Sequence, residues 1–469
     1  MKEFSIVILS ILGLLSLEAQ YISEVLDYRP APGQFINEAP WGVPSARQSL
    51  VGGISGHMSL GFFGGSVVFR FAEPVENHED NPYGVDFTIY GNPMSEWSEP
   101  GAVWVMPDNN GNELPDEDWY ELAGSDYWFS SSRLARVNYE NPGGEEASDV
   151  SWEDEQGNSG KIYANSVHTQ NYYPHQDSFP DIAADSYNVK GRLIRGKVDL
   201  KHPPLIKSQK RAFGYADNQA RGSASDLLPD NPYTPDVENG GGDAFDLDWA
   251  VDSAGNRVEL DHILFVKVQT ALLHEGGYLG EVSTEISGAV DVAPDPTVDD
   301  GPDRILVLAD LPDKCMRDTL QLEAFCFEKG YPVELPELLW TTSVGWAEVD
   351  EHMRLILKGE GEVEISVQLV AEPELTASSY TTVVAVEPLE LFSPLAASEP
   401  VFYPNPATDR IHLNDEAFVS IYDLAGSLLL RALVPTGGGT VECGDLVPGV
   451  YVLLIRDEES IGTHKLVIY

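Results

Sequence analysis

The sequence predicts an all-β protein made of three successive β-sandwiches. Short runs of residues alternate between apolar and polar with a period of two, the pattern of a strand with one buried face. Glycine and proline, at 42 and 32 residues in a chain of 469, separate these runs. No long amphipathic helix interrupts them. We expect a large N-terminal β-sandwich or jelly roll, a second sandwich in the middle and a small sandwich at the C-terminal end.

The amino-acid composition and net charge exclude some classes of binding partner. Hydrophobic residues make up 42% of the chain, which is enough for well-packed cores, and the formal net charge is −48. Such a surface repels phosphate backbones and anionic lipid headgroups, so we expect no nucleic-acid partner. Carboxylates in this abundance suit solubility at high ionic strength or calcium binding.

The first element is a predicted signal peptide at residues 1–19. Lys2 precedes an apolar run from Phe4 to Leu17, followed by Glu18 and the small residue Ala19. The alternative is a buried strand or helix. The run is too short for a comfortable membrane span, and no later stretch reaches about 20 apolar residues, so we expect no transmembrane span.

The second element is the N-terminal domain, residues 20–291, which we expect to carry the specific function. Its strand-like runs are 66–71, 85–90, 102–106, 161–164 and 262–271. Phrases such as Asp86–Asn92, Trp119–Ser125 and Phe245–Asp252 resemble a family of exported bacterial surface proteins. The resemblance implies a surface location and a sandwich fold, and brings no catalytic assignment.

One loop of this domain has the spacing of a calcium site. Side-chain oxygens occupy its positions 1, 3, 5 and 9, a backbone carbonyl occupies position 7, and the residues are Asp108, Asn110, Asn112, Asp116 and Leu114. The loop resembles those of thrombospondin type 3 repeats and, in part, an EF-hand. Glu113 replaces the usual glycine, and Trp119 stands where a bidentate acid is expected, so Glu117, Asp118 or Glu121 would complete the shell. The alternative is an Asn-Gly hairpin whose side chains only cap a turn.

Aromatic residues are the candidate ligand-binding groups. Trp97, Tyr127, Trp128 and Phe129 lie in a segment dense in rings, where exposed rings can stack on sugar faces beside hydrogen-bonding acids and amides. Core packing is the alternative for each ring. Because neighbouring strand residues point to opposite faces, we expect at least one of the last three to be exposed.

An enzymatic alternative depends on carboxylates such as Glu99, Asp246 and Asp248. If Phe245–Trp249 is a strand, Asp246 and Asp248 share one face, either as an acid pair, a metal site or a solvated surface. The sequence has no phosphate-binding glycine loop and no zinc-protease, serine-hydrolase or Cys-x-x-Cys motif. It therefore favours a protein without enzymatic activity while leaving a polysaccharide hydrolase or lyase open.

The middle of the chain contains a predicted linker at residues 292–303, a domain at 304–391 and a second linker at 392–398. Runs at 320–324 and 363–369 alternate with period two. Leu339–Ser343, with Ala347–Asp350 and 359–367, is similar to a bacterial immunoglobulin-like domain, which implies a core tryptophan and a spacer or adhesive role. Cys315 and Cys326 either pair or remain free thiols.

The last element, residues 399–469, carries the most specific sequence. Its four blocks are Tyr403–Asp409, Val419–Gly426, Leu446–Val452 and Lys465–Tyr469. In order and spacing they resemble the C-terminal sorting domain of type IX secretion cargo. The resemblance implies a Bacteroidetes-type bacterium, recognition by the type IX secretion machinery, and a product that is attached to the cell surface or released.

These observations favour an exported, calcium-stabilised, non-enzymatic protein that binds a glycan or another extracellular ligand. Two alternatives remain: the polysaccharide-degrading enzyme, and a protein that captures a small nutrient for an outer-membrane transporter.

Overall fold

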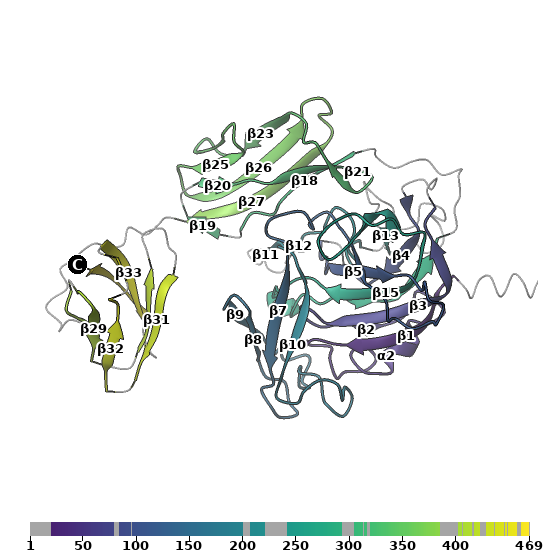
Figure 1. The fold of residues 1–469 in the computed structure, drawn as a ribbon, viewed down its shortest axis with the longest axis horizontal. Helices are drawn as coiled ribbons and strands as arrows, with labels where there is room; N and C mark the ends of the chain where they lie inside the picture. Colours follow the sequence, from purple (N-terminus) through teal and green to yellow (C-terminus); the bar gives the residue numbers. More distant parts are fainter. Residues whose placement is uncertain are drawn as a thin grey trace, which may run out of the picture. The chain divides into compact units, whose positions relative to one another are not determined.

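The computed structural model describes residues 20–469 apart from 79–83, 95, 200–206, 221–241, 293–303, 313, 317–318, 385–401, 406, 415–416, 423–427, 436, 445, 448, 457–460 and 469. The predicted signal peptide and the predicted linkers, except for Val292, lie outside the described residues. The chain forms two compact units, Met1–Val383 and Val384–Tyr469. Strands make up nearly all of the regular secondary structure in both, so the predicted all-β class is confirmed (Figure 1).

The N-terminal sandwich has a six-stranded antiparallel sheet at its centre. Its order is β1 (Ile22–Arg29), β3 (Ser66–Glu76), β15 (His262–Thr270), β5 (Gly101–Met106), β6 (Tyr120–Leu122) and β14 (Ala250–Val251). Strands far apart in sequence are neighbours here. Val67, Phe69 and Phe71 of β3 alternate toward a core of fully buried aromatic and branched side chains.

Smaller sheets surround this centre. One has the order β10 (Ser186–Leu193), β7 (Arg133–Glu140), β8 (Val150–Asp154) and β9 (Ser159–Ile162). Another has the order β13 (Gly242–Phe245), β4 (Phe87–Tyr90) and β17 (Gly288–Asp291). Two short pairs complete the set: β2 (Met58–Ser59) with β16 (Glu285–Ile286), and β11 (Val198–Asp199) with β12 (Lys207–Ser208). In the described residues α2 (Ala46–Ser49) is the single α-helix.

The predicted strand over Phe245–Trp249 is wrong. β13 ends at Phe245, and Leu247–Trp249 form the 3₁₀-helix η2. Asp246 caps this turn by accepting a hydrogen bond from the Asp248 amide at 2.7 Å. The short side chain of Asp competes with strand pairing in this way, so the alternation continues in sequence after the strand has ended.

The middle domain is a β-sandwich of three sheets (Figure 1). The first contains β19 (Lys314–Met316), β27 (Thr376–Val384), β26 (Gly361–Leu369) and β23 (Leu338–Thr342). The second contains β20 (Thr319–Gln321), β25 (Arg354–Leu357) and β24 (Ala347–Val349), and the third β18 (Arg304–Leu308), β21 (Ala324–Glu328) and β22 (Tyr331–Val333). The predicted strand at 320–324 is split, because the chain changes sheet between Gln321 and Ala324.

The core of the middle domain contains the expected tryptophan. Trp340 is partly buried and packs against two clusters of apolar side chains. Cys315, Cys326 and Cys443 are free thiols, so the possible bridge between Cys315 and Cys326 is not formed.

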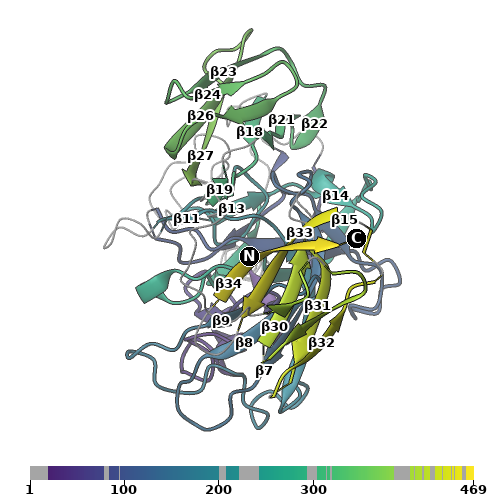
Figure 2. The same ribbon diagram turned by 90° about the vertical axis from the view of Figure 1, so that its left-hand side faces the viewer.

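The C-terminal unit is a smaller sandwich. One sheet contains β28 (Phe402–Tyr403), β29 (Arg410–Leu413) and β32 (Gly439–Glu442). The other has the order β31 (Leu428–Val434), β30 (Ala417–Tyr422), β33 (Gly449–Arg456) and β34 (Ile461–Ile468), as Figure 2 shows. Ile411, Val419, Ile421 and Leu453 lie in its buried core.

Within the described part of the chain, no helix has the length and apolar character needed to cross a membrane.

Candidate functional site

A polar pocket of about 340 Å³ lies at the junction between the N-terminal sandwich and the middle domain. The N-terminal wall includes Asp126 and residues 209–212, which follow β12. The middle domain contributes Leu306–Leu308 on β18, Asp310 just after it, and Thr376–Ser378 on β27. We call this site the junction pocket. Pockets of this size at domain junctions commonly hold small ligands.

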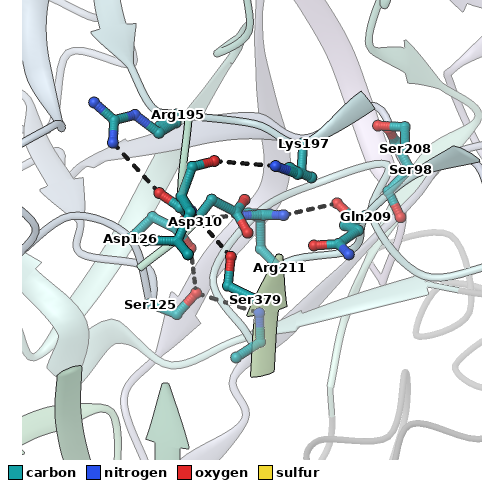
Figure 3. A network of polar contacts seen from close by, with 12 residues as sticks. Ser98, Ser125, Asp126, Arg195, Lys197, Ser208, Gln209, Arg211, Asp310 and Ser379 are labelled. Atoms are coloured by element: carbon teal, nitrogen blue, oxygen red, sulfur yellow. Dashed lines mark hydrogen bonds and ion pairs between the residues drawn. The ribbon is translucent and has the colours of Figure 1, made fainter. Parts of the chain in front are cut away.

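Arg211 is the central residue of the junction pocket (Figure 3). Its Nη1 atom pairs with Asp126 Oδ1 at 2.9 Å and with Asp310 Oδ2 at 2.6 Å, and its Nη2 donates to the Gln209 carbonyl at 3.0 Å. Only 6% of the residue is exposed. Its Nε–H has no hydrogen-bond partner among the described residues, which leaves one buried donor available to a ligand.

Burial and charge act in opposite directions on this group. Burial by itself lowers the pKa of Arg211, but the carboxylates of Asp310 and Asp126 outweigh it and raise the pKa. Burial also raises the pKa of Asp310, against the opposing effect of Arg211. The Arg211 guanidinium therefore stays charged. Its direct ion pairs with Asp126 and Asp310 hold it in place.

Other contacts fix the walls of the junction pocket. Lys197 is buried and donates through Nζ to the carbonyls of Leu311 at 3.1 Å and Tyr380 at 2.7 Å. Ser379 Oγ accepts from the Leu311 amide at 2.9 Å (Figure 3). The Lys197 bonds join the two sandwiches and the Ser379 bond fixes the middle-domain wall, so the pocket is largely preformed and a ligand pays little ordering cost.

Aromatic packing extends the same junction. The rings of Phe129 and Phe325 are 5.3 Å apart, and those of Phe213 and Phe327 are 5.2 Å apart. Ile305 and Phe327 of the middle domain belong to the core of the N-terminal sandwich. The two predicted domains thus share one hydrophobic core.

This packing decides the position of the predicted aromatic ligand-binding residues. Phe129 is buried at the junction, and Trp97 is 4% exposed in a second apolar cluster. Tyr127 and Trp128 are half-buried, and the Arg192 guanidinium lies 4.3 Å from the centre of the Tyr127 ring. Two of the four rings are thus closed to a glycan, and the other two present only part of their surface.

The predicted calcium ligands do gather in one exposed loop, Asp108–Asp116, which we call the acidic loop. Asp108 accepts hydrogen bonds from the amides of Asn112 at 3.1 Å and Glu113 at 3.0 Å. The side-chain amides of Asn110 and Asn112 each donate to Asp116 at 3.0 Å. Glu113 has φ +56°, so it adopts the left-handed conformation expected of glycine at that position.

The three acids expected to complete the calcium shell, Glu117, Asp118 and Glu121, have different surroundings. Glu117 and Asp118 line a hollow of about 400 Å³ beside the acidic loop, together with Asp116. Glu121 instead is buried and forms a two-bond ion pair with Arg192, with both distances 2.8 Å. Glu121 is therefore unavailable to the acidic loop.

The acids of the enzymatic alternative have separate surroundings. Glu99 is buried beside Asp217 and Glu285. Asp246 is 5% exposed, so the interpretation of this residue as part of a solvated face is wrong. Burial raises its pKa well above the ordinary value, and the nearby Asp86 and Asp248 raise it further. Asp248 is half-exposed and pairs with Arg257 at 3.2 Å. The sequence did not indicate the group around Glu99, because its members come from three distant segments.

The family comparison identifies the C-terminal unit. Residues 401–469 match the family described as the secretion system C-terminal sorting domain. The protein is therefore exported by type IX secretion to the cell surface or the extracellular space, and the predicted sorting domain is confirmed.

No curated protein matches the chain in sequence. Among solved structures, the D00-D0 domain of Intimin is 13% identical, with 35% of this chain and 100% of that chain covered and a TM-score of 0.13. The Yersinia pseudotuberculosis adhesin InvE is 11% identical over 35% of this chain and 58% of that chain, with a TM-score of 0.14. Bovine butyrophilin is 11% identical over 36% and 100%, also with a TM-score of 0.14. Likeness this weak supports no conclusion about the fold or the function.

Proposed function

We propose that this exported protein is a non-enzymatic binding protein whose junction pocket takes a small polar ligand, such as one or two sugar units of an extracellular glycan. The observation that carries the proposal is Arg211, which lines a preformed polar pocket and whose buried Nε–H has no partner among the described residues. Hydroxyl or carboxylate oxygens of a ligand would complete its hydrogen bonding.

The chemistry of the lining supports binding over turnover. Asp126 and Asp310 both pair with the charged Arg211, so neither is a free acid that stands ready for proton transfer to a ligand. The exposed Lys210, with Gln209 and Thr376, adds donors and acceptors at the rim. Such a set recognises hydroxyl-rich molecules.

The test is a glycan array followed by isothermal titration with the full chain. Arg211→Lys keeps the positive charge between the two acids but lacks Nε, and Lys210→Ala removes a rim donor. We expect each to weaken binding about tenfold, since a hydrogen bond to a charged group contributes about 1.5–3 kcal/mol. Lys190→Ala, an exposed lysine on β10 that does not line the pocket, is the matched control.

Melting temperatures of the variants separate lost binding from lost folding. A panel of free sugars and small nutrients, run beside the array, distinguishes glycan binding from nutrient capture. Binding that is equal in wild type, Arg211→Lys and Lys210→Ala would exclude the junction pocket.

We also propose that the acidic loop binds calcium and stiffens the end of β5. The gathering of Asp108, Asn110, Asn112, the Leu114 carbonyl and Asp116 supports this, as does the hollow faced by Glu117 and Asp118. The melting temperature with calcium and with chelator, in wild type and Asp108→Ala, tests it.

A further inference from the structure

Three buried carboxylates meet inside the N-terminal sandwich, away from the acidic loop. Glu99 lies just before β5, Asp217 in the segment after β12, and Glu285 at the start of β16. They are 8%, 0% and 3% exposed. One oxygen from each lies within 4.8 Å of the others. We call this group the carboxylate cluster.

Hydrogen bonds hold each member in place. The Glu285 amide donates to Asp217 Oδ2 at 2.7 Å, and the Asn92 amide donates to Oδ1 at 2.9 Å. The Ser283 amide donates to Glu99 Oε1 at 3.1 Å. Ser59 Oγ and Ser283 Oγ both donate to Glu285 Oε1, at 2.8 and 2.7 Å. These donors are all neutral, so they orient the carboxylates without balancing their charge.

The fold supplies cations to some other buried acids, but the described residues supply none to these. Arg192 pairs with Glu121, and Arg211 pairs with Asp126 and Asp310. Within the described residues, no Arg or Lys forms an ion pair with Glu99, Asp217 or Glu285. Oxygen atoms of the Glu99 and Glu285 carboxyl groups instead lie within 4.8 Å of each other, and one from Asp217 lies equally near. Two carboxyls can be this close only if they share a proton or bind a common cation.

A fourth buried acid, close to Glu285 in sequence, also lacks a full set of partners. Ser283 Oγ donates a hydrogen bond to Glu285 at 2.7 Å. Glu281, two residues earlier, is 1% exposed. Its Oε1 accepts from the Gln34 amide at 2.7 Å, while its Oε2 has no partner in the described chain.

Glu281 and Glu285 both lie close to the backbone around Gly61. A Cβ on Gly33 would lie 2.5 Å from Glu281 Oε1 and 3.0 Å from the Gly61 Cα atom. The Gly61 amide in turn donates to Ser59 Oγ, which donates to Glu285. Glu281 and Glu285 thus border the same segment, and the unpartnered oxygen of Glu281 is a further buried acceptor in this part of the core.

We infer that Glu99, Asp217 and Glu285 bind a calcium ion in the core of the N-terminal sandwich, with Glu281 beside them as a further oxygen donor. Calcium takes six to eight oxygen ligands from carboxylates, carbonyls and hydroxyls, and tolerates irregular geometry. An all-oxygen, sulfur-free and imidazole-free set selects such a hard cation over zinc or copper. The site differs from the junction pocket in both position and ligand.

Calcium titration of the full chain, first stripped with chelator, tests the site. Glu285→Gln and Asp217→Asn keep side-chain shape but remove one charge each, and Glu153→Gln, exposed on β8, is the matched control. We expect both cluster variants to bind one calcium fewer than wild type, or to bind it at least 100-fold more weakly. Asp108→Ala should keep this ion, because it affects only the acidic loop.

One measurement needs no cluster variant and so survives a folding failure. Asp108→Ala, purified with calcium and then desalted, should retain one molar equivalent of calcium by elemental analysis. The inference is overturned if Asp108→Ala retains no calcium, or if Glu285→Gln binds calcium as wild type does. A Glu285→Gln protein that is more stable than wild type in both calcium and chelator would also overturn it and assign the cluster to shared protons. None of these outcomes depends on ligand binding in the junction pocket.

Discussion

The acidic loop and the carboxylate cluster collect similar oxygen groups in opposite environments. The residues of the acidic loop are exposed, except for the half-buried Asp108. Their carboxylates accept hydrogen bonds from backbone and side-chain amides of the same loop. In the cluster, Glu99, Asp217 and Glu285 are buried and face one another. Water can screen the charges of the loop, whereas the charges of the cluster must be neutralised by protons or by a cation.

This difference sets the expected energetics. A calcium ion in the acidic loop replaces water molecules and hydrogen bonds between residues of the loop, so its net contribution to stability is modest. A calcium ion in the cluster removes the repulsion between desolvated carboxylates, so its contribution is larger. Two sites of like chemistry therefore differ through burial alone.

The largest effect is expected from combining Asp108→Ala with Glu285→Gln. At a hundredfold excess over Kd, a bound ion stabilises the folded state by about 2.7 kcal/mol. The buried ion, which we expect to bind more tightly, contributes more, so losing both removes at least about 5 kcal/mol. The two sites lie at opposite ends of β5, roughly 17 Å apart along six residues, and we expect additive losses. Urea unfolding in calcium and in chelator measures this. A calcium response that persists in the double variant would show that other ligands are responsible.

A second large effect concerns a buried acid outside both sites. Burial raises the pKa of Asp86 to about 7, from an ordinary value of 3.8. The unfolded chain releases this proton near pH 4 and the folded chain near pH 7, so the stabilisation present at low pH is lost as the pH rises between them. The loss is on the order of 4 kcal/mol, at 1.36 kcal/mol per pKa unit.

Asp86→Asn should therefore flatten the pH dependence of unfolding between pH 4 and 7. Urea unfolding across this range, in chelator, gives the slope for both proteins. Asp27→Asn, a change to a half-exposed acid on β1, is the control. An unchanged slope in Asp86→Asn would assign the pH dependence to other acids.

A smaller effect is expected from Asp108→Ala alone. In calcium, the variant should lose about 1–3 kcal/mol of stability, because one bound ion and the two hydrogen bonds to the Asn112 and Glu113 amides are removed. In chelator the loss should shrink to the contribution of the hydrogen bonds. Thermal unfolding in both buffers provides the comparison, and an equal loss in the two would make the acidic loop a simple polar turn.

The smallest effect is expected from Glu113→Gly. Glycine adopts the left-handed conformation of this position without strain, a gain of up to about 1 kcal/mol. The change also removes the exposed ion pair between Glu113 and Arg70, which contributes little. Calcium affinity should rise a few-fold in titration calorimetry, and a fall would show that the Glu113 carboxylate itself supports the loop.

The local features of the molecule were predictable from sequence. Period-two alternation located β3, β5, β15 and β26 closely, because apolar and polar side chains alternate along a strand that has one buried face. The acidic loop and the sorting domain were recognised for the same reason, since all their determinants lie within one short stretch.

Only the tertiary structure decided the rest. It joined the N-terminal sandwich to the middle domain through Arg211 and Phe129, and this junction buried a ring that the sequence left available. It also brought together Glu99, Asp217 and Glu285, which are separated by more than sixty residues at each step. Sequence periodicity specifies which face of a strand is buried, but strand pairing decides which distant segments meet there, and the chemistry of both the junction pocket and the carboxylate cluster depends on that pairing.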